Sequence, residues 1–438
     1  MSTAHHRRLR KPFIGAALIG VGMLVLAACS GGGGGGGGAT SEPTKFEFLK
    51  NAENTTTEPI LQALATGACK AENTALPLEV SSIPQADLDA KVALLASQDG
   101  LPPMFSAGGN PAEGAKLNKA GYLLDFDKAL TDLGVRDKVS EGAVSTIKKL
   151  YGGSFDMLPY QYNIEGIFYN KKIFADNGWA VPATWDDLLA LAAKAKAAGL
   201  TAFSASGEQG WPLTRLVSGY LFRTLGPDAL REVADGKAKL TDPDYVAAAK
   251  QIADLGAKGY FGSNVASLDY DAATNEFLTG KAAMIYMGSW LLGNINSDTD
   301  AIGADNVGFF PFPAVSGGKG SIDQYPANVG LPATFGASTY SPKVADWLKC
   351  ITTNYGNEAL KQGQITGFVA DDTSISLPAI STTIKQTIDS SKDSVLWFEA
   401  LFNAKASSIS STNAALLVTG QMSPEDFMKS VQDALDAG

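Results

Sequence analysis

Eight consecutive glycines, Gly31 to Gly38, limit the part of this chain that can fold into a packed domain. Glycine loses the most backbone entropy on folding and has no side chain to bury, so a run of this length cannot contribute to a core. Such a run is typical of a flexible tether. The sequence therefore predicts a separate leader before the glycines and a folded body that begins near Lys45.

The leader has the features of a secretory signal. Residues 1–12 carry four basic residues and no acid, and Phe13–Ala28 is an apolar run of 16 residues. A bilayer-spanning helix needs about 20 residues, so this run is too short to span a membrane and fits the apolar region of a signal peptide. We expect residues 1–28 to be a signal peptide that is removed on export.

The exit of the leader, Leu26-Ala27-Ala28-Cys29, resembles the lipobox of bacterial lipoproteins. The resemblance implies that Cys29 is diacylated and becomes the mature N-terminus, with residues 29–44 as its glycine-rich tether. A flexible chain of about 15 residues reaches ~20 Å, which would hold the folded body on the extracytoplasmic face of the cell membrane. An ordinary signal followed by a chance cysteine is the alternative.

The composition of the mature chain disfavours several functions. Removing residues 1–28 leaves 410 residues, enough for two domains. Four of the 35 basic residues lie in the leader, so 31 remain against 45 acids, and a net charge of −14 argues against a nucleic acid partner. Both histidines, His5 and His6, are also in the leader, which removes histidine-based catalysis and imidazole metal sites. The chain has no phosphate-binding loop, so we expect another chain to bind any ATP that is used.

Short apolar strands alternate with helical stretches along the mature chain. "KFEFLK" at 45–50, "LPLEVSSI" at 76–83 and "PPMFSAG" at 102–108 are strand candidates separated by helix-like segments, a pattern that predicts parallel α/β layers. Capping boxes at Thr184–Asp187 and Ser423–Asp426 predict the starts of two later helices.

Two stretches of the second half carry a family resemblance. "IEGIFYNKKIFADNGWAVPATWDDLLALAAKAKAAG" covers Ile164–Gly199, and "FLTGKAAMIYMGSW" covers Phe277–Trp290. A third match is "LLVTGQMSPEDFMKSVQDAL" near the C-terminus. Behind a lipobox, these motifs closely resemble the extracellular solute-binding proteins (family 1, sugar type) that serve bacterial ABC importers. The resemblance covers nearly all of residues 45–438.

The resemblance implies an α/β, two-lobed periplasmic-binding-protein-like fold (type II), with a hinge between the lobes and the ligand in the cleft. Lobe one would hold residues 45–161 and 322–366, and lobe two residues 162–321 and 367–438. It also implies a membrane-anchored receptor that captures a sugar or oligosaccharide by hinge closure and delivers it to the transmembrane permease subunits of an ABC importer. We expect a monomer without a cofactor or a metal.

The remaining cysteines, Cys69 and Cys350, are expected to form a disulfide. Two cysteines in an exported protein are more often a structural disulfide than two reactive thiols. The family layout places both in lobe one, which supports the pairing.

Candidate ligand contacts in lobe two follow predicted strands. Trp290 comes after the strand of "KAAMIYMGSW", where the family often places a tryptophan that stacks on sugar. Glu208, Gln209 and Trp211 follow the strand "TAFSAS", and open α/β sheets bind ligands at strand ends. Aromatic rings suit the apolar face of a sugar, and carboxylates and amides suit its hydroxyls. Packing in a core is the alternative for each tryptophan, and plain solvation for the polar pair.

Candidate contacts in lobe one are polar residues after its strands. Asn51 and Glu53, in "NAEN", follow the first strand, where the family commonly places polar ligand contacts, and Asn110 follows the third. Maltose-type members often carry Trp and Asp in that third loop. This chain has Gly108, Gly109 and Asn110 there, which argues against a maltose-like ligand.

Three more aromatic residues complete the candidate site. Tyr160 and Tyr162 lie near the first predicted crossover between lobes, and Trp397 lies in "SVLWFEALF". A structural role in a core is the alternative for each of them.

Other functions remain open at this stage. A secreted glycoside hydrolase would need two carboxylates at a fixed separation, for which Glu165 and Glu208 are candidates. Glu165 lies inside the crossover strand, where the family has no catalyst, so we expect no enzymatic activity. A receptor for another solute, such as a polyamine or iron, and an adhesin are further alternatives; the aromatic loops favour carbohydrate.

Overall fold

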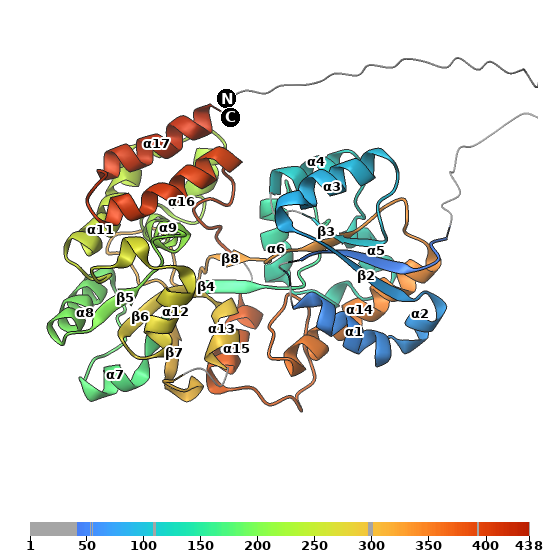
Figure 1. Cartoon of the computed structure of the whole chain (residues 1–438), viewed down its shortest axis with the longest axis horizontal. Coiled ribbons are helices and arrows are strands. Elements are labelled where there is room, and N and C mark those ends of the chain that lie inside the picture. The colour runs from blue at the N-terminus through green and yellow to red at the C-terminus, as the bar shows by residue number, and fades with distance from the viewer. Residues whose placement is uncertain are drawn as a thin grey trace, which may run out of the picture. The chain divides into compact units, whose positions relative to one another are not determined.

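The computed structural model of the chain describes residues 42–52, 54, 56–107, 111–296, 301–391 and 394–437 (Figure 1). The predicted signal peptide, the predicted lipidation site Cys29 and most of the predicted tether lie outside these residues. Within the described ranges, no helix is long and apolar enough to cross a membrane.

The first sheet contains four strands in the order β2–β1–β3–β9. These strands are β1 (Phe46–Asn51), β2 (Leu78–Ile83), β3 (Met104–Ser106) and β9 (Ala333–Phe335). As the alternation of strands and helices predicts, β1 pairs in parallel with β2 and β3, whereas β9 arrives from much later in the chain and pairs antiparallel with β3. We call this sheet and its helices lobe one.

The helices of lobe one come from both ends of the sequence. They are α1 (Thr57–Thr66), α2 (Lys70–Ala75), α3 (Gln85–Ser97), α4 (Pro111–Lys119), α5 (Phe126–Asp132), α6 (Glu141–Leu150) and α14 (Pro342–Lys361). The hydroxyl of Ser341 accepts a hydrogen bond from Val344 N and so caps the start of α14.

The second sheet has the order β5–β6–β4–β7, with β8 paired to β4. Its strands are β4 (Asn163–Asn170), β5 (Thr201–Ser204), β6 (Ala282–Gly288), β7 (Val307–Phe310) and β8 (Ala327–Asn328). β5 and β6 are parallel, but β4 runs antiparallel to β6, β7 and β8, so this sheet is mixed. We call it and its helices lobe two.

Ten α-helices pack in or beside lobe two in the described part of the chain. They are α7 (Lys171–Asp176), α8 (Trp185–Ala197), α9 (Trp211–Leu225), α10 (Ala229–Ala234), α11 (Pro243–Ala257), α12 (Tyr270–Leu278), α13 (Leu292–Ile295), α15 (Ala379–Ser390), α16 (Ala404–Val418) and α17 (Pro424–Asp436). The capping box predicted at Thr184 is confirmed at the start of α8, and Ser423 caps α17 as expected.

The chain passes between the sheets through segments that pair with one another. Asn163 and Ile164, at the start of β4, pair with Asn328 and Ala327 of β8, and Pro326 forms a parallel bridge with Val395. We call these three paired segments the crossover ribbon; Figure 1 shows β4 and β8 at the junction of the two sheets. The lobe boundaries given above on sequence grounds remain predictions.

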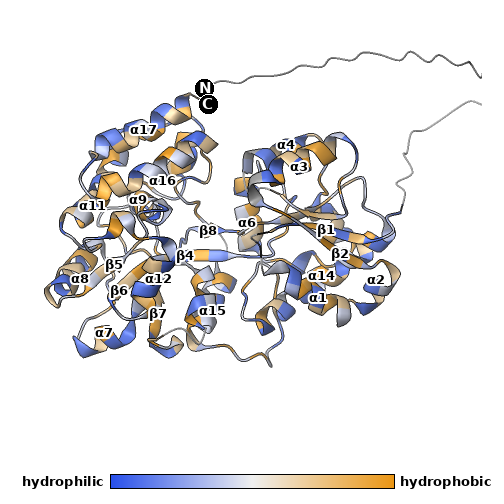
Figure 2. Cartoon of the chain, viewed as in Figure 1, coloured by the Kyte–Doolittle hydropathy of each residue, from blue (hydrophilic) through white to orange (hydrophobic). Residues whose placement is uncertain are grey.

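The strands of lobe two are buried on both faces. In β4, Ile167 faces one buried cluster and Phe168 faces the other, and β6 alternates in the same way through Tyr286 and Met287. This double burial explains why "AAMIYMG" is apolar without interruption. Figure 2 shows that the surrounding helices, in contrast, carry both hydrophilic and hydrophobic residues.

A disulfide joins Cys69 and Cys350 in lobe one, as predicted, with their Cα atoms 5.8 Å apart. Cys69 precedes α2 and Cys350 lies in α14, so the bond connects helices from the two ends of the sequence. Glu72 lies close enough to the two cysteines that the three side chains could ligate a metal ion. Both sulfur atoms, however, already form the disulfide.

Candidate functional site

Two of the predicted tryptophans lie together at the first turns of helices in lobe two. The ring centroids of Trp211 and Trp290 are 5.9 Å apart with the rings edge to face, and Tyr270 lies 6.0 Å from Trp211. The indole Nε1 of Trp290 donates a hydrogen bond to the hydroxyl of Tyr270 at 3.1 Å. All three side chains are only half-buried, so part of each ring remains available to a ligand.

Arg215 connects a third predicted tryptophan to this group. Its guanidinium carbon lies 5.3 Å from the ring centroid of Trp211 and 5.1 Å from that of Trp397, within the range of a cation–π contact. Trp397 is also half-buried. We call Trp211, Tyr270, Trp290, Trp397 and Arg215 the aromatic cluster.

A glycine allows Trp211 to occupy its position. Gly210 has φ +69°, and a Cβ atom there would lie 1.7 Å from the carbonyl oxygen of Ser411 in α16. Because only glycine tolerates both the left-handed backbone and this close approach, α9 can begin directly against α16 with Trp211 as its first residue.

A second glycine positions Trp290. A Cβ atom on Gly288 would lie 1.9 Å from Cζ3 of Trp290, so the indole ring covers the backbone at the end of β6. Between them, Ser289 accepts a hydrogen bond from Ile164 N at 3.3 Å and donates one to Asn163 Oδ1 at 3.2 Å. The Gly-Ser-Trp sequence therefore fixes the ring against β6 and ties it to the crossover ribbon.

Two buried carboxylates contact the guanidinium of Arg215. Glu165 in β4 forms an ion pair with the guanidinium, and Glu399 Oε2 lies 3.6 Å from its Nε. Burial raises the pKa of Glu399, against the lowering effects of Arg215 and of the hydrogen bond that Thr214 donates to it. Arg215 is thus oriented by the carboxylates of Glu165 and Glu399.

Two cavities adjoin the aromatic cluster. The Trp290 cavity has a volume of about 210 Å³, and its lining includes Thr56, Gln161, Asn163, Trp290 and Gln364. The Trp397 cavity has a volume of about 380 Å³, and its lining includes Pro111, Trp397, Glu399, Ser407, Ser408 and Ser411. The two linings share no residue.

The other predicted contacts in lobe two lie beside the cluster on the loop before α9. Glu208 and Gln209 are exposed, and Gln209 accepts a hydrogen bond from Ser206 in its own loop. Within the described ranges, no hydrogen bond joins either side chain to the four aromatic residues of the cluster. Their role in binding stays a prediction.

The predicted polar contacts of lobe one are described only in part. Asn51 is fully buried at the end of β1, where its backbone N–H donates a hydrogen bond to Ser106 Oγ at 3.2 Å. Glu53 and Asn110 lie outside the described residues.

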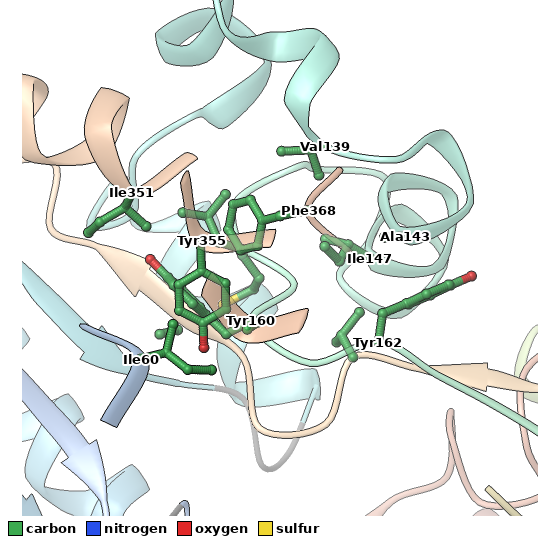
Figure 3. Packing of buried hydrophobic residues seen from close by; sticks show 14 of the residues in the cluster. Ile60, Val139, Ala143, Ile147, Tyr160, Tyr162, Ile351, Tyr355 and Phe368 are labelled. Carbon is green, nitrogen blue, oxygen red and sulfur yellow. The ribbon is translucent and has the colours of Figure 1, made fainter. Parts of the chain in front are cut away.

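Tyr160 and Tyr162 are buried just before β4, and in the described part of the chain neither ring contacts the aromatic cluster. Tyr160 is 1% exposed, and its ring centroid lies 4.9 Å from that of Tyr355 and 5.3 Å from that of Phe368. Figure 3 shows these three rings packed together. Tyr162 is fully buried, with its hydroxyl 3.3 Å from Thr146 Oγ1. Both tyrosines are therefore part of the hydrophobic core next to the crossover ribbon.

Arg215 and Tyr270 are cluster residues that were not predicted from the sequence. Arg215 lies four residues after Trp211 on α9, the spacing at which two side chains meet on one helix face, so a search for partners of Trp211 could have found it. Tyr270 is the first residue of α12, and no local signal distinguishes it from other residues that follow a capping aspartate.

Known proteins resemble this chain in sequence. A family model described as bacterial extracellular solute-binding protein matches residues 52–358. The multiple sugar-binding protein of Streptococcus mutans is 24% identical over 312 residues, which span 69% of this chain and 70% of that protein. An ABC transporter extracellular-binding protein of Pyrococcus horikoshii is 26% identical over 208 residues, and this match spans 45% of that relative's length.

Solved structures show the same fold. The structure described as a chitin oligosaccharide binding protein is 27% identical, covers 90% of this chain and 100% of its own, and superposes with a TM-score of 0.73.

Proposed function

This chain belongs to the family of bacterial extracellular solute-binding proteins, and from that premise we propose that it captures a sugar or oligosaccharide. The observation that carries the proposal is the aromatic cluster, in which three half-buried tryptophans lie at or near the helix starts of lobe two. Indole rings suit the apolar C–H faces of sugar rings, and the names of the Streptococcus mutans and chitin oligosaccharide relatives point to the same class of ligand.

The polar groups beside the rings fit the same ligand. The Trp290 cavity is lined by the side-chain amides of Gln161, Asn163 and Gln364, which both donate and accept hydrogen bonds. Hydroxyl groups around a sugar ring need partners of both kinds, and few convergent polar groups among apolar walls are the usual composition of a ligand site.

The same geometry disfavours hydrolysis by Glu165 and Glu208. Glu165 is 1% exposed and is engaged by Arg215, whereas Glu208 is exposed on a loop. A glycosidase pair must face one glycosidic bond from two sides, and a carboxylate neutralised by a buried guanidinium is a poor acid or nucleophile. Solute capture without catalysis is the function that this arrangement supports.

We further propose that the lobes close on the ligand about the crossover ribbon and that the loaded receptor docks on the permease subunits of an ABC importer as a monomer. The predicted lipidation of Cys29 and the glycine-rich tether would hold it at the extracytoplasmic face of the membrane.

A thermal-shift screen of the mature protein against neutral sugars tests the proposal. A ligand that binds only the folded state stabilises it by about 2.7 kcal/mol at a hundredfold excess over Kd, so a true ligand must raise the melting temperature in a concentration-dependent way. The panel should contain chitin, xylan, raffinose and maltose oligosaccharides, with polyamines and ferric citrate as the competing classes. Stabilisation by a polyamine or by iron alone, with no response to any sugar, would replace the proposal by a non-sugar receptor.

A further inference from the structure

We infer that the ligand is a neutral oligosaccharide that occupies the Trp290 cavity and the Trp397 cavity together, so that a monosaccharide fills only part of the site. The inference rests on the proposed function and specifies its ligand. It follows from the order of the rings in the aromatic cluster, the walls of the two cavities and the charges that line them.

The two outer tryptophans of the cluster, Trp290 and Trp397, line different cavities. Trp290 contacts Trp211, Trp211 contacts the guanidinium of Arg215, and Arg215 contacts Trp397, each at a distance of 5–6 Å. Trp211 and Arg215 thus come between Trp290 and Trp397 in this order of contacts, and the two outer tryptophans line different cavities. A sugar ring stacks on an aromatic face at van der Waals contact, so we expect a ring in one cavity to stack on the tryptophan of that cavity alone.

Each cavity has walls from both lobes. The Trp290 cavity includes Thr56 and Gln161, which are hydrogen-bonded to each other at 2.8 Å beside the start of α1. The Trp397 cavity includes Pro111, the first residue of α4. Because both hollows combine residues of lobe one with a tryptophan of lobe two, closure on a ligand in either cavity is strengthened by occupation of the other.

The charges in the two cavities favour a neutral ligand. Their described linings contain no lysine or arginine, and Glu399 contributes a carboxylate to the Trp397 cavity. The nearby Arg215 is already engaged by Glu165 and Glu399. A uronic acid would therefore bring a second negative charge to Glu399 without a free cation to balance it.

Calorimetric titration with a ladder of one sugar series tests the inference on the mature protein. The probes are N-acetylglucosamine and its β-1,4-linked dimer, trimer and tetramer, followed by the xylose ladder if that series gives the larger thermal shift. We expect the trimer to bind at least 100-fold more tightly than the monomer. A trimer that ends in a uronic acid should bind at least 10-fold more weakly than its neutral counterpart.

Two truncations assign the cavities. Trp290→Ala and Trp397→Ala should each weaken trimer binding about 30-fold, the loss expected for ~2 kcal/mol at an anchoring aromatic residue. The monomer, which occupies one cavity, should respond to only one of the two variants. Trp179→Ala is the matched control, because this half-buried tryptophan packs on Phe174 in lobe two and outside the cluster. A urea unfolding curve for each variant verifies that it is folded.

The outcomes separate this inference from the proposed function. A monomer that binds within threefold of the trimer, or a trimer that ignores Trp397→Ala, overturns the two-cavity ligand but leaves a sugar receptor. If the trimer that ends in a uronic acid binds more tightly than its neutral counterpart, the inference that the ligand is neutral is wrong. Failure of every sugar in both ladders overturns the proposed function itself.

Discussion

Trp290 and Trp347 are tryptophans of one protein with opposite expected roles. Trp347 is fully buried, stacks on Phe46 at 4.8 Å and donates its Nε1–H to the carbonyl of Leu76 at 2.8 Å. Trp290 is half-buried beside a cavity. The two side chains therefore provide a matched test of binding against packing.

We expect Trp347→Ala to cost about 3–5 kcal/mol of unfolding free energy, as for a large aromatic residue removed from a core. Trp290→Ala should cost much less stability and should lose ligand affinity instead. Urea unfolding and calorimetric titration of both variants measure the two effects. A large stability loss for Trp290→Ala with unchanged affinity would make Trp290 structural and would shift the site toward Trp211 and Trp397.

Asp156 is a buried carboxyl group that makes stability depend on pH. It is fully buried in lobe one, where burial raises its pKa to about 6 and the neighbouring charge of Asp125 adds to this rise. The folded state therefore holds this proton more tightly than the unfolded chain, whose aspartate has a pKa near 3.8. The contribution of Asp156 to the free energy of unfolding is therefore fully present below about pH 4. It falls by about 3 kcal/mol as the pH rises from 4 through 6.

We expect Asp156→Asn to remove this loss. The variant should be more stable than the parent protein at pH 7.5 and should differ little from it at pH 4. Urea midpoints of the two proteins at both pH values measure the effect, because every other titrating group is shared. An equal difference at the two pH values would show that the carboxyl does not titrate between them.

The start of a helix could be predicted from the sequence where the capping residue and its partner lie within one turn of each other. Thr184 and Ser423 each bond a backbone N–H three residues ahead, so the starts of α8 and α17 could be predicted from the sequence. The position of Trp290 after a buried strand could be predicted as well, because the apolar run of β6 is visible in the sequence. These features do not depend on distant parts of the chain.

Features that depend on distant partners could not be predicted in this way. Tyr160 is buried because Tyr355, almost 200 residues later, packs against it. The meeting of Trp397 with Arg215 likewise requires α9 and the segment before α16 to come together. The antiparallel direction of β4, which makes the second sheet mixed, is also set by strands far away in the sequence.

The start of α9 depends on Gly210, and we expect Gly210→Ala to disturb it. The new methyl group would meet the backbone of Ser411, which cannot move without shifting α16, and the left-handed backbone adds about 1–2 kcal/mol of strain. The variant should lose more than 2 kcal/mol of stability and should bind sugar more weakly, because Trp211 moves with the helix.

Gly420→Ala provides the control for this substitution. Gly420 has φ +74° and open space where a Cβ would lie, so it shares the backbone strain without the steric contact. Gly420→Ala should lose only about as much stability as the backbone strain costs, and its sugar affinity should be unchanged. If urea unfolding shows the same loss of stability for both variants, the contact between residue 210 and α16 does not contribute to the effect.

The Cys69–Cys350 disulfide closes a loop between residues 281 positions apart. A loop of this length removes much entropy from the unfolded chain, and we expect the Cys69→Ala/Cys350→Ala variant to lose about 4–5 kcal/mol. Urea unfolding of the variant, beside the parent protein with and without reductant, measures the loss. Free thiols at both positions in protein purified from its native envelope would refute the bond.

Membrane attachment should depend on Cys29 alone. We expect Cys29→Ser to move the protein from the membrane fraction to the soluble fraction, with an unchanged unfolding curve, because the substitution lies before the folded lobes. Cell fractionation followed by immunoblotting measures the distribution. A variant that remains in the membrane fraction would require another anchor.

The route of the chain through the two sheets also sets an order of assembly during synthesis. β3 and β9 are neighbours in the first sheet, yet all five strands of the second sheet, β4 to β8, are translated between them. At about 5–20 residues per second, the roughly 220 intervening residues take on the order of 10–40 s to emerge from a ribosome. Throughout this time β3 presents an unpaired strand edge that could bind another chain. The nascent first sheet therefore needs protection, by a chaperone or by export in an unfolded state, until its last strand arrives.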